Sequence, residues 1–377
     1  CHCYLFLNSF GDTHSIDWIG SLIRGKADYG TNTRLNSSRQ YIVSTDYIRL
    51  DSFHWEKFAT RNLLQGSSME NILRIICSTE FFYSIFRVTT PILLAALGAM
   101  ITSRAGVVNI GLEGIMLFSA LAGVVTSAWT QSAAVGLLAA ILVGVLISAL
   151  MAYVMLVLRS DITLTGFAVN ALGSGCTVFL LYVICNDKGI SSSLASKVLP
   201  KVNLPLIQDI PFVGKVLSGH NIMTYVAFLL IIVIYWLVNK PPLGLRIRAV
   251  GENPHAAESV GIKVTRIQLI AMLISGVLAG MAGAYMSMGY VSWFARDMMA
   301  GRGFIALAAQ QLGQGTVVGS MLASLAFGAA DSLANNLQAL RLPSEFVQSI
   351  PYAVTIVGLV IYSASKKRRE QRLAAGK

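Results

Sequence analysis

A carboxylic acid inside an apolar stretch is the first feature of this sequence that could do chemistry. Glu113 is the one charged residue of Gly106–Ala128, and Asn109 precedes it by four residues. If this stretch crosses a membrane, a charge at mid-depth costs at least about 2.5–3.5 kcal/mol, so Glu113 should face protein, water or a partner. If the stretch is helical, both side chains share a face. They form either the lining or hinge of a solute pathway, or a clamp between helices beside Gly111 and Gly114.

Asn170 presents the same choice in a second apolar stretch. It follows Thr163 and Thr165 within Ile162–Ile184. Amides and hydroxyls are the natural hydrogen-bond partners of sugar-like hydroxyl groups. A pathway lining is therefore the preferred interpretation of Thr165 and Asn170.

Two further charges lie near the ends of apolar stretches. Arg302 precedes Gly303–Leu312, and Asp331 lies near the end of Val317–Ala334. We expect Arg302 to be an interfacial anchor and Asp331 to lie at a solvated outer mouth. The predicted pathway then consists of amides and hydroxyls rather than ion pairs.

Residues suited to catalysis or metal binding do not form a recognisable pattern. Cys77, Cys176 and Cys185 lack metal-ligand spacing and are predicted to be packing residues. GSLIRGKA (Gly20–Ala27) has the spacing of a phosphate-binding loop, but Ala27 replaces the magnesium-binding hydroxyl and no apolar strand precedes it. No Ser/His or paired-Asp arrangement supports an intramembrane hydrolase. We predict no catalytic residue, no cofactor and no metal, and therefore not an enzyme.

The elements that must position these residues are apolar and long. The chain has 377 residues, of which 55% are hydrophobic and 12% charged, with a mean hydropathy of +0.64. This composition predicts an integral membrane protein, since about 20 apolar residues span the hydrocarbon. Nine stretches qualify or come close: Phe81–Thr102, Gly106–Ala128, Ala133–Leu158, Ile162–Ile184, Ile222–Val238, Leu269–Met288, Gly303–Leu312, Val317–Ala334 and Phe346–Ser363.

Their pattern predicts helices. The stretches are apolar all round rather than alternating at every second residue, which excludes a barrel. The predicted fold is therefore an all-α polytopic transmembrane helical bundle of about nine spans. Gly303–Leu312 is too short to cross alone, so its helix either includes Met298–Arg302 or is re-entrant.

The net charge of +11 is distributed as in a membrane protein rather than a nucleic-acid-binding protein. Basic residues flank the apolar stretches, as the positive-inside rule expects of cytoplasmic segments. With nine spans, the Lys240–Arg266 loop and the basic tail 366–377 lie in the cytoplasm, and Asn186–Gly219 lies outside. The same topology places Arg104 and Arg159 inside.

Residues 1–68 differ from the rest in composition. They are rich in polar and charged residues, contain no apolar span and have no methionine before Met69. We expect them to lie upstream of the biological start; the alternative is a genuine extension of the protein. The predicted permease domain is 69–365, followed by the basic tail 366–377.

A short polar segment, GENPHAAESVGI (Gly251–Ile262), separates two of the most apolar parts of the chain. Asn253 is a good N-cap, Pro254 suits the first helical position and Gly261 permits the left-handed turn that ends a helix. Ala256, Ala257 and Val260 would form a small apolar face. A helix of about seven residues is not stable alone, so it must pack on its own bundle or insert into a separate cytoplasmic motor as a coupling helix.

Five segments resemble one family in the same order along the chain. The family is the ABC-importer permeases for branched-chain amino acids, simple sugars and nucleosides, and the resemblance is closest to the nucleoside permeases paired with basic-membrane-protein-type lipoproteins. The segments are Ser103–Gly123, Asp161–Gly173, Gly244–Ile262, Ala300–Ala309 and Leu342–Ile356, and the resemblance covers about Met69–Arg369. The polar run Gln310–Gly319 departs from the family pattern.

The resemblance implies a membrane-spanning subunit that translocates a nucleoside or related solute across the bacterial cell membrane. It implies an ATP-binding subunit, a second and homologous permease, and an extracytoplasmic lipoprotein that delivers the small polar substrate. The residues that it assigns to ATPase coupling are Gly251, Glu252, Asn253, Pro254, Ala256, Ala257 and Gly261. The predicted translocation pathway contains Asn109, Glu113, Thr165, Asn170 and Phe304.

A secondary transporter or channel that acts without ATP is the alternative. It predicts coupling carboxylates or histidine relays at mid-membrane, whereas Glu113 is nearly solitary in this sequence. Survival of uptake without the partner ATPase would favour this alternative.

Overall fold

The computed structural model describes residues 78–203, 213–338, 353, 358 and 360, and the regular elements within these ranges are helical. Strand-like pairing in the described residues consists of two isolated bridges, Ile190 with Ala295 and Lys201 with Asn221. These ranges belong to one unit, Leu63–Lys377. The predicted helical class is therefore confirmed for this part of the chain.

Seven of the helices are long and apolar enough to cross a membrane. The longest are α4 (Thr79–Arg104), α6 (Ala133–Leu156) and α7 (Ile162–Cys185), and α12 (Val264–Tyr285) continues into the π-helical turn η1 (Met286–Tyr290). The others are α5 (Leu112–Thr130), α9 (Ile222–Asn239) and α14 (Val317–Gln338). The predicted count of nine is not reached in the described residues.

The two remaining stretches of the predicted nine account for the difference. Gly303–Leu312 forms α13 (Arg302–Leu312), whose 11 residues rise about 16 Å, or roughly half of the hydrocarbon thickness. Phe346–Ser363 lies outside the described residues except for isolated positions. Helix α13 is therefore long enough to cross about half of the hydrocarbon layer.

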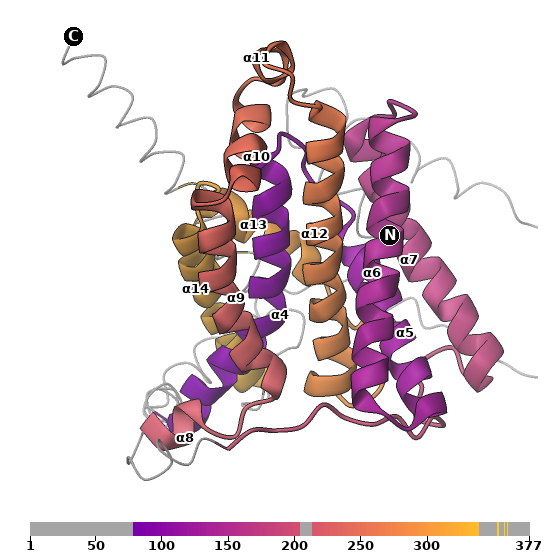
Figure 1. The fold of residues 1–377 in the computed structure, drawn as a ribbon. Coiled ribbons are helices and arrows are strands. Elements are labelled where there is room, and N and C mark those ends of the chain that lie inside the picture. The colour runs from indigo at the N-terminus through magenta and orange to yellow at the C-terminus, as the bar shows by residue number, and fades with distance from the viewer. Residues whose placement is uncertain (1–77, 204–212, 339–352, 354–357, 359, 361–377) are drawn as a thin grey trace, which may run out of the picture. The chain divides into compact units, whose positions relative to one another are not determined.

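The helices connect two ends of this unit, which Figure 1 shows at top and bottom. At one end, termed the α11 end, lie α10 (Pro242–Glu252) and α11 (Pro254–Ser259), with the end of α4 and the start of α7. At the opposite end lie α8 (Val213–Leu217) and the connection between α7 and α9. Arg104 and Arg159 thus share an end with the Lys240–Arg266 loop, as the charge pattern predicts.

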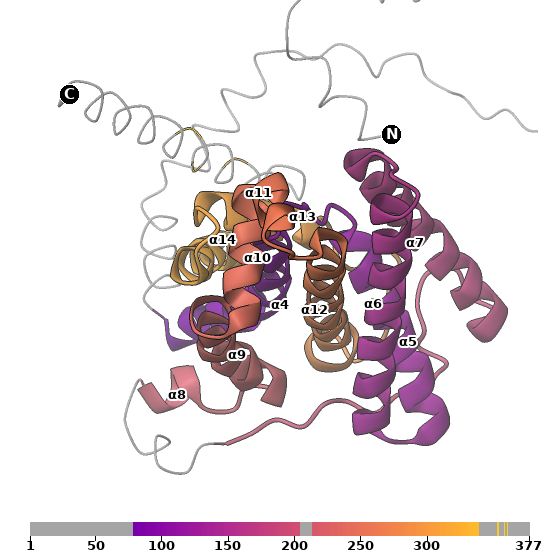
Figure 2. The ribbon, with the colours of Figure 1, turned by 45° about the horizontal axis from the view of Figure 1, so that its top comes forward.

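Helix α4 lies at the centre of the packing. Its residues from Val88 to Thr102 are all buried, and it packs against α9, α12, α13 and α14. Figure 2 shows α4 and α12 between α6 and α7 on one side and α9, α10 and α14 on the other. Because α4 has no lipid-facing surface along this length, its own movement requires movement of its neighbours.

Small residues let α6 and α12 approach closely. A Cβ added at Gly144 of α6 would lie 2.6 Å from the carbonyl oxygen of Gly276 and 2.9 Å from Cα of Gly280. The small-residue run Ser275–Tyr285 thus serves helix packing, as is usual in membranes. The outer face of α6 instead carries exposed leucines every four residues, at Leu138, Leu142, Leu146 and Leu150.

At the end opposite α11, the segment before α13 is tied to the segment after α7. Ser191 donates its N–H to the carbonyl of Phe294, and its hydroxyl accepts the N–H of Phe294 at 2.8 Å. Arg296 donates its N–H to the carbonyl of Gly189. Nearby, the buried His220 ring stacks on Tyr83 with centroids 4.0 Å apart, and its Nε2 lies 2.8 Å from the carbonyl oxygen of Val216.

Helix α5 begins later than the sequence predicts. Residues Gly106–Gly111 are not helical, and Gly106 has a φ of +77°, where glycine is favoured. The prediction that Asn109 and Glu113 lie one helical turn apart on a common face is therefore wrong. The physical reason is that Gly106, Asn109 and Gly111 all favour a break in the helix.

Candidate functional site

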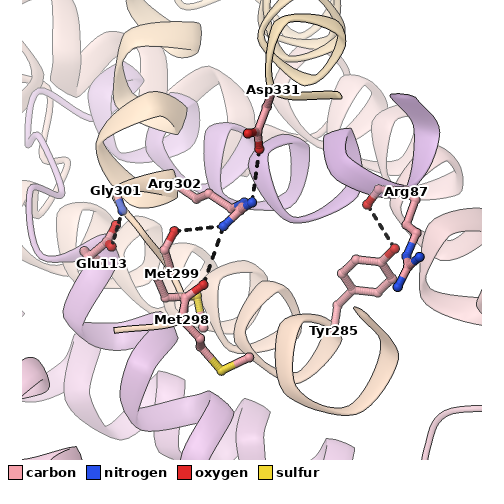
Figure 3. A network of polar contacts seen from close by, with 8 residues as sticks. All are labelled: Arg87, Glu113, Tyr285, Met298, Met299, Gly301, Arg302 and Asp331. Carbon is pink, nitrogen blue, oxygen red and sulfur yellow. Dashed lines mark hydrogen bonds and ion pairs between the residues drawn. The ribbon is translucent and has the colours of Figure 1, made fainter. Parts of the chain in front are cut away.

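Glu113 lies in the first turn of α5, and its side chain caps the start of α13. Its Oε1 accepts the N–H of Gly301 at 2.8 Å (Figure 3), and its Oε2 accepts the N–H of Gly303 at 2.7 Å. These N–H groups belong to the beginning of α13, where backbone donors have no partner within the helix. A carboxylate there also interacts favourably with the positive end of the helix dipole. Glu113 therefore joins α5 to α13.

The glycines beside this carboxylate are required by the close approach. A Cβ added at Gly303 would lie 2.7 Å from both the backbone N and Oε2 of Glu113. Gly301, the N-cap of α13, has a φ of +80°. The sequence AGRGF thus places two backbone donors against one carboxylate, which a side chain at Gly303 would obstruct. We name the contact of Glu113 with Gly301 and Gly303 the α5–α13 junction.

Arg302 and Asp331 form an ion pair beside the junction. Arg302 Nη2 lies 3.1 Å from Asp331 Oδ2, and the two side chains are 13% and 14% exposed. The guanidinium also reaches the carbonyls of Met298 and Met299 (Figure 3). The predictions of an interfacial anchor at Arg302 and a solvated mouth at Asp331 are wrong, since α13 and α14 bring the opposite charges together.

The predicted asparagines bind neighbouring segments. Asn109 is fully buried and donates from Nδ2 to the hydroxyl of Ser275 on α12 at 2.9 Å. Asn170 accepts the N–H of Gly114 at 2.8 Å and donates to the carbonyl of Ile110 at 2.9 Å. Asn170 thus holds α7 against the last part of the break and the first turn of α5. These contacts fit the clamp interpretation.

Thr165 and Phe304 differ from the asparagines. The Thr165 hydroxyl donates to the carbonyl of Asp161, the N-cap of its own helix, and Thr165 is largely buried. Phe304 is 40% exposed, and its ring centroid lies 6.3 Å from that of Phe167 on α7. Among the five predicted pathway residues, only Phe304 is exposed, whereas the other four are buried or partly buried. Phe167 is a residue that sequence reasoning did not select.

The segment predicted to be a coupling helix has the predicted caps. In α11, which we name the peg, the Asn253 side chain accepts the N–H of Ala256 at 3.1 Å, and Pro254 is the first helical residue. Gly261 has a φ of +83°. These three local predictions are confirmed. The peg follows α10 directly, so that Glu252 ends one helix and Asn253 begins the next.

The predicted apolar face of the peg is mostly exposed in this chain, and its docking on a partner stays a prediction. Only Ala257 is buried, at 3% exposed, whereas Ala256 is exposed and Val260 is 75% exposed. Ala257 packs into the main core and holds the peg in place. The rest of the peg remains accessible in this chain, including Pro254 and Ala256, and so does Glu252 at the end of α10.

Direct backbone packing connects the peg region to α13. A Cβ added at Gly251 would overlap the carbonyl oxygen of Arg104, so the end of α10 lies against the turn after α4. Arg104 in turn donates from Nε to the carbonyl of Gly315 at 2.6 Å. Gln310 of α13 donates to the hydroxyl of Ser103 at 3.1 Å. The contacts therefore run from α10 through the Ser103–Gly106 turn to α13.

Similarity to known proteins covers most of this chain. Residues 81–364 match the family described as branched-chain amino acid transport system / permease component. The nucleoside ABC transporter permease protein NupC of Lactococcus lactis subsp. cremoris is 34% identical over 303 residues, covering 78% of this chain and 93% of that protein.

Two further relatives differ in the substrates for which they are named. The guanosine ABC transporter permease protein NupQ of Bacillus subtilis is 33% identical over 299 residues, covering 76% of this chain and 92% of that protein. The putative glucose ABC transporter permease protein TsgC13 of Haloferax volcanii is 32% identical over 257 residues, covering 67% of this chain and 76% of that protein. The two relatives named for a nucleoside or guanosine match more of this chain, 78% and 76%.

Proposed function

Because this chain belongs to the family of branched-chain amino acid transport system permease components and is the membrane permease subunit of an ABC importer, we propose that it carries a nucleoside. The observation that supports this substrate is the identity of 33–34% to permeases named for nucleosides and guanosine. A permease of this kind is not an enzyme, and an ATPase subunit supplies the energy.

The peg is the proposed contact with that ATPase. It is rigid, because its first turn is capped by Asn253 and its buried Ala257 fixes it to the core. It is also accessible, because the remaining residues are exposed. The proposed contact set is Gly251, Glu252, Asn253, Pro254, Ala256, Ala257 and Gly261. Two of these act by packing within the chain, Gly251 on the turn after α4 and Ala257 on the core.

Movement of the peg would be transmitted to α13. A displacement of α10 must move the Ser103–Gly106 turn, since backbone atoms meet there without an intervening side chain. That turn holds α13 through Gln310 and the following Gly315. At its other end α13 is joined to α5 by Glu113. ATP-driven closure at the peg would thus tilt α13 and α5 relative to each other.

The pathway is proposed to run beside the α5–α13 junction. Non-helical backbone at membrane depth occurs where it is buried in protein or lines a water-filled space, and broken helices build the substrate sites of many transporters. A non-helical segment, Gly106–Gly111, and the start of a short helix, α13, both lie beside this junction. Asn109, Glu113, Thr165 and Asn170 would maintain the shape of the pathway, and Phe304 would face it.

The remaining parts of the assembly are proposed from the same premise. A second, homologous permease encloses the pathway, and an extracytoplasmic lipoprotein delivers the substrate. The α11 end and the tail 366–377 face the cytoplasm of a bacterial cell, and nine spans cross the membrane when α13 and the Phe346–Ser363 region are counted. The permease domain is 69–365, and residues 1–68 lie outside it.

Reconstitution with and without partners tests this function. The permeases, the ATPase and the binding lipoprotein in proteoliposomes should accumulate guanosine only when ATP is present. Replacing exposed Ala256 by Trp should reduce uptake at least tenfold, because a large side chain prevents insertion of the peg. Leu138→Trp on the lipid-facing side of α6 is the matched control and should transport normally. Uphill uptake without the ATPase would refute the proposal.

A further inference from the structure

Helix α7 has two different sides. One carries large apolar residues that are 50–68% exposed, namely Leu164, Leu172, Phe179 and Val183. The other carries Thr163, Phe167, Asn170 and Ser174, whose spacing of four, three and four residues places them on one face. On this face Thr163 and Phe167 are exposed, whereas Asn170 and Ser174 are partly buried. Phe167 is therefore the aromatic member of a polar face, whereas Phe179 belongs to a face suited to lipid.

Phe167 meets an exposed aromatic residue of α13. The rings of Phe167 and Phe304 are 6.3 Å apart at 30°, and the side chains are 46% and 40% exposed. Phe304 follows Gly303, which contacts Glu113 at the junction. Two turns further along α13, Gln311 is also exposed. The face of α13 that carries Phe304 is thus partly polar, like the α7 face that carries Phe167.

The approach to this pair along the chain begins in water at the end opposite α11. The segment that leads into α13 exposes Arg296 and Asp297 at that end, with 64% and 57% of their side chains accessible. Charges exposed to that extent are not stable against hydrocarbon. The start of α13 lies about 16 Å from the Gly313–Thr316 turn at the α11 end, which is near mid-membrane for a hydrocarbon layer of about 30 Å.

We infer that Phe167 and Phe304 form an aromatic surface in the pathway, on which the planar base of a nucleoside stacks as it passes the α5–α13 junction. Every nucleobase presents a π-face, and stacking on phenyl rings tolerates different bases without directional hydrogen bonds. Such a surface holds a solute weakly enough to release it. This inference rests on the proposed nucleoside substrate and adds the residues that recognise it.

Conservative substitutions test the aromatic surface. In proteoliposomes that contain the complete transporter, Phe167→Leu and Phe304→Leu should each lower the guanosine uptake rate about five- to tenfold at saturating binding protein. Leucine fills similar space but cannot stack. Phe167→Tyr and Phe304→Tyr should restore the rate. Phe179→Leu on the lipid-facing side of α7 is the matched control and should transport normally.

A second measurement does not depend on transport. Irradiation of the purified complex with 8-azidoguanosine should label peptides that contain Phe167 or Phe304, and the label should disappear in the double leucine variant. If leucine variants transport like Phe179→Leu, or if tyrosine fails to restore uptake, the aromatic surface is refuted. If the wild-type complex transports another solute but no nucleoside, the proposed function itself has failed.

Discussion

The peg and α13 are both short helices that begin at a side-chain cap, but the caps come from different places. Asn253 caps the peg from within its own segment. Glu113 caps α13 from 188 residues earlier in the chain. A local cap makes a helix rigid without attaching it to anything else, whereas a remote cap also joins two parts of the fold. The peg is therefore suited to be contacted, and α13 to respond.

The strongest test of this contrast is removal of the remote cap. Glu113→Ala leaves the N–H groups of Gly301 and Gly303 without their acceptor, at about 1–3 kcal/mol each, so we expect about 4 kcal/mol of lost stability and loss of transport. Thermal unfolding in detergent measures the loss. Glu80→Ala, at an exposed position in the first turn of α4, is the control and should change little. Equal stability of both variants would contradict the remote cap.

Breaking the ion pair beside the junction should have the next largest effect. Asp331→Ala leaves the Arg302 guanidinium largely buried without its carboxylate, which costs about 3 kcal/mol. The double variant Arg302→Met, Asp331→Leu should unfold at a higher temperature than the single variant, because neither charge remains. A double variant that is less stable than Asp331→Ala would show that the charges contribute independently.

Removal of the local cap should have a smaller and confined effect. Asn253→Ala should cost about 1 kcal/mol and increase amide hydrogen exchange in residues 254–261 only, while the unfolding temperature of the bundle stays the same. Asn253→Ser should retain most of the protection. Faster exchange in α13 would contradict the confined effect, since it would mean that the peg and α13 open together.

The smallest effect concerns a contact that titrates, at the end opposite α11. Burial lowers the pKa of His220 below its ordinary value of 6.5, and the charge of Arg87 lowers it further. The unfolded chain therefore binds the proton more readily, so stability should be constant above pH 6.5 and fall as the pH drops below it. Unfolding temperatures between pH 7.5 and 5 should fall less for His220→Gln. An equal fall would exclude His220 as the cause.

The contrast between the two caps also explains which features could be predicted from sequence. Asn253, Pro254 and Gly261 act within a few residues, so their pattern indicated the peg correctly. Nothing near Glu113 in the sequence indicates Gly301 and Gly303 as its partners, because their meeting depends on how α5 and α13 pack. Local signals thus predicted a local cap and missed a remote one.

Two errors in the predicted site had readable signals. Gly106, Asn109 and Gly111 lie close together and favour a break, yet the apolar composition of the stretch suggested one continuous helix. Arg302 and Asp331 are opposite charges in separate apolar stretches, a combination that usually indicates pairing inside the membrane. The helical class and most span boundaries follow from composition, which depends on no particular contact.

The contact between Gly251 and Arg104 limits how much a force can be absorbed. Long side chains at an interface change rotamer when pushed and thereby take up small displacements, but here two backbones touch directly. This contact therefore leaves almost no room for one segment to move before the other is displaced. Even a sub-ångström displacement of α10 would then reach the neighbouring turn undiminished, and one methyl group at position 251 would be enough to disengage the two.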